Sequence, residues 1–376
     1  MTFTISSKTL LDVTLAVGQG ISRKNQVPIL DYFLFEIDGD ARKLTITASD
    51  LEIAITGTAG VICDGGQAPS FGVPASYLLD ILKELDDVPI TCTGEVTEGR
   101  LDLSWGAGTA SMPIVDGATY PRPSFQTDAQ RILLPASIIR QGLVKAEMAV
   151  VEDLLRPVLG GINFNITPDA LSLVGTDGHR LVVYEVHQEL GVSQNFILPK
   201  RGAHIVGNLI KAAPSETEIG LLLDGRNACF VLGAYTVFCR VIEGHFPNYS
   251  AVIPKGHNHI LMVSRRAFLS ALKRVSVCAA KATNMIRLGV ASDSLAIEGC
   301  DADFAISAQE NIPCSYQGDA FEIGFKATYL MDILGLFEDD EVSIALGAPT
   351  QAAIIRPQTE QGDTAILTLL MPMIIS

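Results

Sequence analysis

The polar cluster TDGHR, residues 176–180, comes closer than other parts of the sequence to a catalytic arrangement. An aspartate that orients a histidine makes a general base, and a general base beside a serine or cysteine makes a hydrolase. No nucleophile motif of the GxSxG type lies near it, and the chain has only six histidines. Asp177 and Gly178 also suit a two-residue type I′ turn, whose central residues both need positive φ. The sequence therefore favours a turn with a structural or recognition role, and a hydrolase centred on His179 is the weaker alternative.

Other catalytic and cofactor signals are weak. The sequence has neither GxxxxGK[ST] nor a GxGxxG that opens a helix after a strand, which argues against nucleotide hydrolysis and dinucleotide binding. The carboxylates of residues 337–341 read better as a solvated loop after a helix than as a metal site. The seven cysteines form no CxxC pair, so a reduced compartment fits and a zinc site does not. We expect no catalytic residue, no metal and no cofactor.

The C-terminal stretch LTLLMPMIIS is apolar almost to its last residue. A final strand explains Leu367 and Leu369. It explains Met371, Pro372 and Met373 less well, because proline interrupts strand pairing and methionine adapts to varied partners. Such a surface suits a groove for peptides. These residues alone leave burial in a core and a peptide groove equally open.

Three series of segments recur along the chain, and they predict the elements that position these residues. A strand followed by a helix begins at Phe3, Ile132 and Ile260, paired strands begin at Leu44, Leu171 and Leu295, and a second strand and helix begin at Gly72, Ile197 and Gly324. The steps are 124 to 129 residues, far longer than solenoid repeats. We therefore expect three tandem domains over residues 1–128, 129–255 and 256–376.

Each repeat changes its hydrophobic period along its length. Residues 7–17 place apolar side chains at helical spacing after Ser6 and Ser7, which suit a helix N-cap. Residues 44–49 alternate apolar and polar side chains, as a strand does. The pattern predicts an α+β fold in which two helices of each domain pack on antiparallel strands.

The charge is distributed unevenly between predicted elements. The chain is 48% apolar and carries a formal charge of −15, which argues against tight binding of nucleic acid. The six predicted helices, residues 7–21, 75–85, 136–149, 199–211, 264–281 and 326–337, hold thirteen basic and five acidic residues, or +8, which leaves −23 elsewhere. Helix propensity does not explain this, since glutamate favours helices about as well as lysine. A shared basic helix face would bind duplex phosphates without reading sequence.

No targeting or membrane signal is recognised. The apolar N-terminal stretch is interrupted by Lys8 and Asp12, unlike a secretory signal. No run reaches the ~20 apolar residues that span a bilayer. We expect a cytoplasmic protein that does not enter a membrane.

Several motifs together give a family resemblance over essentially the whole chain. They are ASDLEIAI at 48–55, GTDGHRLVVYEV at 175–186, LPKRG at 198–202, GHFPNYSAVIPK at 244–255, EIGFKATYLMDIL at 322–334 and the terminal MPM. In order and spacing they closely resemble the bacterial DNA polymerase III beta subunit, the sliding clamp. The resemblance implies three DNA-clamp domains and a head-to-tail homodimer that closes a ring around duplex DNA. The first-domain edge near Leu101–Ile114 should then pair with the third-domain region near Phe268–Leu288.

The resemblance also implies a non-catalytic processivity factor that tethers the replicative polymerase. A groove between the second and third domains would recruit the polymerase, the clamp loader and other proteins that carry a clamp-binding motif. Its residues would be Leu159, Thr176, Gly178, His179, Arg180, Leu181, Pro247, Val252, Leu369, Met371, Pro372 and Met373. The DNA-facing residues would be Arg23, Lys24, Arg140, Lys145, Lys200, Arg201, Arg265, Arg266, Lys273 and Arg274.

Two departures from the family pattern bear on partner preference. Ala251 stands where arginine is common, and Ile374-Ile375-Ser376 replaces the usual Arg-Leu ending. A clamp-like scaffold that does not encircle DNA remains the second reading of the chain.

Overall fold

The computed structural model describes residues 1–22, 24–123, 125, 130–211, 214, 217–256, 259–359 and 362–375. The predicted Arg23 and the predicted boundary at 128/129 lie outside them. The helices are α1 (Ser7–Gly18), α2 (Ala75–Lys83), α3 (Ala136–Glu147), α4 (Lys200–Ile210), α5 (Arg265–Val275) and α6 (Ala327–Gly335), with short 3₁₀ turns at η1 (Pro28–Asp31), η2 (Gly117–Thr119), η3 (Pro157–Leu159), η4 (Tyr249–Ala251) and η5 (Ser276–Cys278).

The strands follow the repeat in the sequence. The first third contains β1 (Thr2–Ser6), β2 (Tyr32–Asp38), β3 (Lys43–Ser49), β4 (Ile53–Gly60), β5 (Ile62–Cys63), β6 (Phe71–Pro74), β7 (Pro89–Glu95), β8 (Arg100–Trp105), β9 (Gly108–Pro113) and β10 (Val115–Asp116). The middle third contains β11 (Ile132–Pro135), β12 (Gly161–Thr167), β13 (Ala170–Thr176), β14 (Arg180–His187), β15 (Gln194–Pro199), β16 (Glu218–Leu223), β17 (Asn227–Leu232) and β18 (Tyr235–Arg240). The last third contains β19 (His259–Ser264), β20 (Met285–Val290), β21 (Ser294–Asp301), β22 (Ile306–Tyr316), β23 (Phe321–Lys326), β24 (Glu341–Leu346), β25 (Ala353–Pro357) and β26 (Thr364–Leu370).

All three predicted series are present. The strand-helix starts are β1-α1, β11-α3 and β19-α5, and the second strand-helix elements are β6-α2, β15-α4 and β23-α6. Ser6 caps α1 by accepting a hydrogen bond from the Thr9 N–H at 3.3 Å, which satisfies one of the free donors of the first turn. The predicted α+β architecture is therefore confirmed, with helix ends moved by a few residues.

The chain forms two compact units, and the division runs through the middle repeat. One unit comprises Met1–Arg140 with His204–Val241, and the other comprises Gln141–Ala203 with Ile242–Ser376. In the first, a five-stranded sheet has the order β5-β1-β7-β8-β9, and a nine-stranded sheet has the order β10-β6-β2-β3-β4-β18-β17-β16-β11. The middle repeat is divided because its β18 pairs with β4 of the first third.

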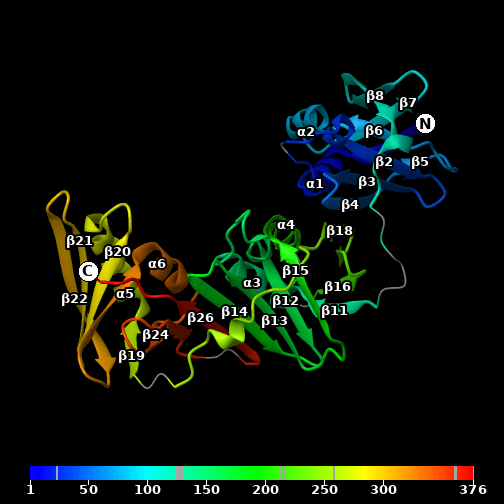
Figure 1. Cartoon of the computed structure of the whole chain (residues 1–376). Helices are drawn as coiled ribbons and strands as arrows, with labels where there is room; N and C mark the ends of the chain where they lie inside the picture. The colour runs from blue at the N-terminus through cyan, green and yellow to red at the C-terminus, as the bar shows by residue number, and fades with distance from the viewer. Residues whose placement is uncertain are drawn as a thin grey trace. The chain divides into compact units, whose positions relative to one another are not determined.

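The second unit is built on one twelve-stranded sheet with the order β15-β12-β13-β14-β26-β25-β24-β19-β22-β21-β20-β23. β14 pairs with β26 from Arg180↔Leu370 to Val186↔Thr364, and Figure 1 shows the red β26 beside the green β14. Its main core is lined by Phe268, Leu272, Ile286 and Phe325, all fully buried or nearly so. Strands from two repeats thus form one surface, on which the TDGHR turn and the C-terminal stretch meet.

The uneven charge distribution persists with the observed helix bounds. The six helices found in the described residues carry ten basic and four acidic residues, a net +6, which leaves −21 for the remainder of the −15 chain. Four of the basic residues lie on α5. Among the described residues, no helix is long and apolar enough to cross a bilayer.

Candidate functional site

The TDGHR turn is not the predicted two-residue type I′ turn. Thr176 pairs with Leu181, so four residues, 177–180, lie between these two paired positions, and of these only Gly178 has positive φ, at +89°. The Asp177 carboxylate instead accepts hydrogen bonds from the His179 N–H at 2.8 Å and the Arg180 N–H at 2.9 Å. The prediction failed because the register fixes the length of the turn, and a side chain rather than a second left-handed residue closes it.

Hydrogen bonds within this turn occupy the groups that a catalytic pair of Asp177 and His179 would need. The second Asp177 oxygen accepts from the Arg180 Nε at 3.1 Å, so both carboxylate oxygens are engaged by the turn itself. His179 is exposed; its main-chain N–H donates to Asp177, and its carbonyl accepts from the Met371 N–H. An aspartate that orients a histidine must reach the imidazole, and this one is held elsewhere. The geometry argues against a hydrolytic centre at His179.

Arg180 is buried and joins β14 to α6. Its Nη1 donates to the Asp332 carboxylate at 2.7 Å, and its guanidinium lies 4.2 Å from the centre of the Tyr329 ring. The Arg180 side chain is 8% exposed, whereas Asp332 is 50% exposed. A buried guanidinium needs paired charge and full hydrogen bonding. Arg180 therefore faces the interior of the second unit and fixes the turn to a helix of the last third.

The residues after β26 are held at two points, on either side of Pro372. The Met371 N–H donates to the His179 carbonyl at 2.8 Å, and the Met373 N–H donates to the Gly324 carbonyl at 2.8 Å. Gly324 allows this approach, because a Cβ there would lie 2.9 Å from the Met373 oxygen and 3.1 Å from Ile375 Cγ1. Proline has no N–H to place, so the MPM sequence matches the bonding pattern. The tail is seated across strands from two repeats, with Met371 42% exposed.

An apolar cluster lies beside this seated tail. Its buried members are Val174, Leu181, Val183, Ala352 and Leu369, and three residues of the segment 246–253 pack on it: Phe246, Tyr249 and Ile253. Leu181 and Leu369 were expected in the groove, and they pair directly across β14 and β26. The three covering residues were missed, because the segment reads as a Pro-rich joint. The apolar positions 246, 249 and 253 were the available signal.

The remaining predicted groove residues lie on adjoining segments. Leu159 is buried in η3, Thr176 ends β13, Pro247 is exposed and Val252 is 59% exposed. A Cβ on Gly244 would lie 2.8 Å from Val158, which places η3 against the start of the covering segment. Arg156 Nη2 donates to the Asp177 carbonyl at 3.5 Å, which brings η3 to the turn. Arg156 was not predicted, and it also pairs with Asp153 at 2.9 Å.

The predicted DNA-facing cations differ in how much of their charge is already engaged. Arg274 pairs with Glu310 through two hydrogen bonds, Arg265 Nε donates to the Asp339 carbonyl at 2.7 Å, and Lys200 donates to the Val150 carbonyl at 2.8 Å. Lys145 lies over the Tyr184 ring, and burial lowers the pKa of its ammonium. Arg266 pairs with Asp340 at 3.4 Å, and Arg140 donates to the Lys211 carbonyl. Lys24, Arg201 and Lys273 complete the described set.

Three like α+β repeats, a basic set of helices and an apolar cluster beside the seated tail are the features that a related protein should share. Comparison with known proteins identifies the class. Models of the N-terminal, central and C-terminal domains of the DNA polymerase III beta subunit match residues 1–122, 133–248 and 250–374. The chain belongs to the DNA polymerase III beta subunit family.

Relatives match this chain over 95% or more of its length. The beta sliding clamp of Pseudomonas aeruginosa is 25% identical over 99% of this chain and 100% of its own, and that of Synechococcus elongatus is 28% identical over 95% of each. Among solved structures, the sliding clamp of Bartonella birtlesii bound to griselimycin has a TM-score of 0.92 at 27% identity, covering 100% of both chains. The chain is therefore a sliding clamp of DNA replication, a non-catalytic processivity factor that acts with duplex DNA and the polymerase.

Proposed function

We propose that two copies of this chain close head to tail around duplex DNA in the cytoplasm, and that the seated tail, the TDGHR turn and the apolar cluster form the groove that binds partner peptides. The domains would divide at residues 128 and 255. One observation carries the groove assignment: main-chain hydrogen bonds from Met371 and Met373 place the tail against the turn and β23, beside the Leu181–Leu369 cluster. The polymerase, the clamp loader and other clamp-binding proteins would use this groove in turn.

The groove chemistry favours a short apolar peptide. Met371 and Val252 present exposed apolar surface, and the methionine thioether adapts to side chains of different shape. The main-chain bonds on both sides of Pro372 hold the wall in place before binding, which lowers the cost of ordering it. Several partners can then share one site without a matched pocket for each.

Truncating Met371 tests the groove. Met371→Ala should weaken the binding of a fluorescent polymerase-tail peptide by about 10-fold or more. Anisotropy titrations measure this affinity, and a loss of this size is usual when a central apolar anchor is removed. Val144→Ala is the matched control, because Val144 is 62% exposed on α3. Deleting residues 371–376 should abolish peptide binding while sedimentation still shows a dimer. Unchanged peptide affinity in both tail variants would refute the assignment.

Unpaired strand edges support the head-to-tail contact and revise one part of the sequence prediction. β9 is the outer strand of its sheet, within the expected Leu101–Ile114 edge. β20, in the expected partner region, has β21 on one side and β23 on the other, so it has no edge for a further strand. β22 pairs with β19 only at residues 314–316, and among described strands its stretch 306–312 has only β21 beside it. We infer that β9 of one copy adds to this stretch of β22.

Proline tests the edge pairing because it removes a main-chain donor. Adjacent residues of a strand direct their N–H groups to opposite sides, so Ala110→Pro or Ser111→Pro must remove an outward donor of β9. We expect at least one of the two variants to sediment as a monomer at micromolar concentration. Thr97→Pro, in the exposed turn before β8, should remain a dimer. Dimers in both β9 variants would exclude this edge.

Enclosure of DNA has a topological test. The protein is loaded by a clamp loader on nicked circular DNA, which is then cut to a linear form. A ring should slide off the ends, so release on linearisation supports enclosure, and retention would show direct adhesion or a scaffold. Lys273→Gln should remove about one phosphate contact, so the slope of the logarithm of the DNA-binding constant against the logarithm of salt concentration should become less steep by about one. Arg274→Gln should have a smaller effect, since Glu310 already shares that guanidinium.

A further inference from the structure

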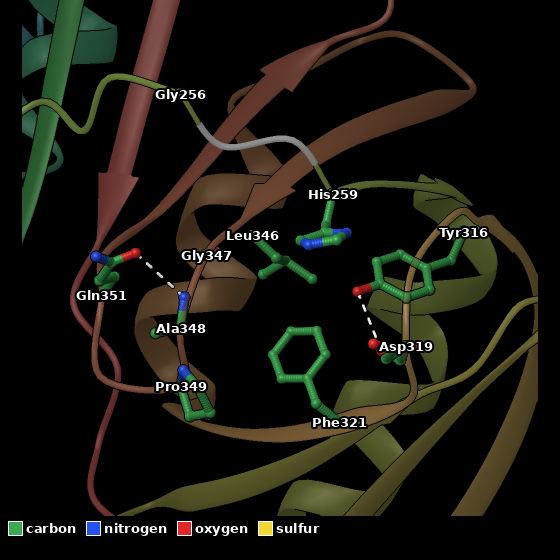
Figure 2. Close-up of a pocket in the computed structure, with 10 residues that line it drawn as sticks. All are labelled: Gly256, His259, Tyr316, Asp319, Phe321, Leu346, Gly347, Ala348, Pro349 and Gln351. Carbon is green, nitrogen blue, oxygen red and sulfur yellow. Dashed lines mark hydrogen bonds between the residues drawn. The ribbon is translucent and has the colours of Figure 1, made fainter.

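A separate hollow lies in the last third, where four strand ends meet. It is about 350 Å³ and is lined by ten residues at the start of β19, the end of β22, the start of β23 and the end of β24 with its following loop. Figure 2 shows His259, Tyr316 and Phe321 around it, with Leu346 among them. None of the ten belongs to the predicted groove or to the predicted DNA-facing set.

Three aromatic rings form one side of this pocket. The rings of His259 and Tyr316 are 6.0 Å apart and tilted by 41°, and those of Tyr316 and Phe321 are 6.2 Å apart and tilted by 46°. Neighbouring rings are thus inclined rather than stacked on each other. Leu346, which is 1% exposed, adds an apolar wall. Inclined rings around a small hollow resemble the sites in which proteins bind organic cations through the negative faces of the rings.

Hydrogen bonds hold the pocket in shape. The Tyr316 hydroxyl donates to the Asp319 carbonyl at 3.3 Å, His259 Nδ1 shares a hydrogen bond with the Gln317 carbonyl at 3.2 Å, and the Gln351 amide oxygen accepts from the Ala348 N–H at 3.1 Å. Gly318 lets the rim lie close to the rings, because a Cβ there would lie 2.5 Å from His259 Nδ1 and 2.6 Å from the Tyr316 hydroxyl oxygen. The cavity therefore exists before any ligand arrives.

The charge of the lining residues favours a ligand of positive charge. Asp319 is the one lysine, arginine, aspartate or glutamate among the ten lining residues. Burial raises the pKa of the Tyr316 phenol, and the negative charge of Asp319 nearby raises it further. A carboxylate beside aromatic faces attracts a cation and repels a phosphate. Duplex DNA and nucleotides are poor candidates for this site.

We propose that this pocket binds a basic side chain, an arginine, from a protein partner of the clamp. The guanidinium would lie against the partly exposed ring of Phe321, in front of the buried Tyr316, and donate hydrogen bonds to the exposed Asp319. Arginine suits the site better than lysine, since its planar, weakly hydrated cation stacks on aromatic rings. The pocket is distinct from the peptide groove. Gln351 lines the pocket and its neighbour Ala352 lies in the groove cluster, so one loop borders both.

The test uses the full-length protein and two synthetic peptides, Ac-Gly-Gly-Arg-Gly-Gly-NH₂ and the same peptide with citrulline, which has nearly the same shape without the charge. Binding is followed by saturation-transfer NMR. We expect saturable binding of the arginine peptide. The citrulline peptide should bind at least about 5-fold more weakly, because it makes no cation–π contact and no ion pair. Equal binding of both peptides, or of neither, would overturn the proposal.

Two variants locate the binding. Asp319→Asn and Phe321→Leu should each lower the affinity for the arginine peptide by about 3-fold or more. Asp303→Asn, on an exposed turn, is the matched charge control and should have no effect. Met371→Ala should also leave this binding unchanged, so failure of the groove assignment and failure of this proposal are distinguishable. Asp319 is exposed, so its variant should fold, and undiminished binding to Asp319→Asn would overturn the proposal.

Discussion

The turn at residues 49–53 and the turn at residues 176–180 are closed by the same hydrogen bonds from main-chain N–H groups to side-chain oxygens, but their surroundings differ. Asp50 accepts from the N–H groups of Glu52 and Ile53 at 3.1 and 2.8 Å, as Asp177 does from His179 and Arg180. The N–H of Leu51 donates to Ser49, and that of Gly178 donates to Thr176, both at 3.1 Å. Leu51 has φ of +78° and Gly178 of +89°. The repeat is thus preserved to individual hydrogen bonds.

The same correspondence extends to the strands that join successive repeats. The Arg240 N–H donates to the Glu52 carbonyl after β18, as the Met371 N–H donates to the His179 carbonyl after β26. Two residues later, Ile242 donates to Ile197 and Met373 donates to Gly324. At the first joint the side chains are an exposed ion pair, Arg240 with Glu52 at 3.7 Å. At the second they are methionine and histidine, so side chains alone turn a structural joint into a candidate site.

The largest expected difference between the turns follows from Arg180. Asp177→Ala leaves that buried guanidinium with Asp332 as its remaining carboxylate partner and should cost about 3 kcal/mol. Asp50→Ala removes hydrogen bonds to two main-chain N–H groups at a partly exposed turn and should cost about 1 kcal/mol. Urea unfolding measures both, with circular dichroism for the whole chain. The single tryptophan, Trp105 in β8, reports on the first third. Equal losses would show that Arg180 does not depend on Asp177.

The seated tail should be sensitive to one methyl group. Gly324→Ala places a Cβ 2.9 Å from the Met373 oxygen, so the tail must shift, and peptide affinity should fall by about 10-fold. Gly335→Ala is the control, since a Cβ there meets nothing within 4 Å. Anisotropy titrations with the polymerase-tail peptide measure the effect. Equal affinity of the two variants would mean that the contact with Gly324 does not position the tail.

The smallest expected effect concerns backbone strain. Leu51→Gly relieves a left-handed leucine but adds chain entropy to the unfolded state, so we expect a gain of about 0.5 kcal/mol. Gly178→Leu should lose at least about 1 kcal/mol, because its Cβ would also meet Arg156 at 2.9 Å. Urea unfolding followed by Trp105 fluorescence measures the first change, and circular dichroism the second. Destabilisation by Leu51→Gly would show that the leucine side chain packs in a way its 58% exposure does not suggest.

The fold was largely predictable because its signals are local. Helical spacing located the six helices of the described residues, Ser6 was one of two candidate caps with Ser7, and the recurring segments gave the three repeats. A residue's face on a strand or helix depends on its near neighbours in sequence, so hydrophobic period is enough.

The candidate site was predictable only where a resemblance supplied it. Arg180 and Asp332 are 152 positions apart, and nothing in their spacing indicates a hydrogen bond. The turn type depended on the pairing of Thr176 with Leu181 rather than on the Asp-Gly pair. The cover formed by Phe246 and Tyr249 depended on what lay beneath that segment. Long-range geometry decides each of these features, and a single sequence does not contain it in readable form.

The ladder between β14 and β26 has a consequence for how the clamp responds to load. It runs over residues 180–186 and 364–370, while the ladder between β4 and β18 runs over residues 53–57 and 235–239. Amides at the centre of the longer ladder should exchange with deuterium only through disruption of the joined sheet. Under a stretching force, the middle and last repeats should therefore unravel together, and the shorter seam should yield first.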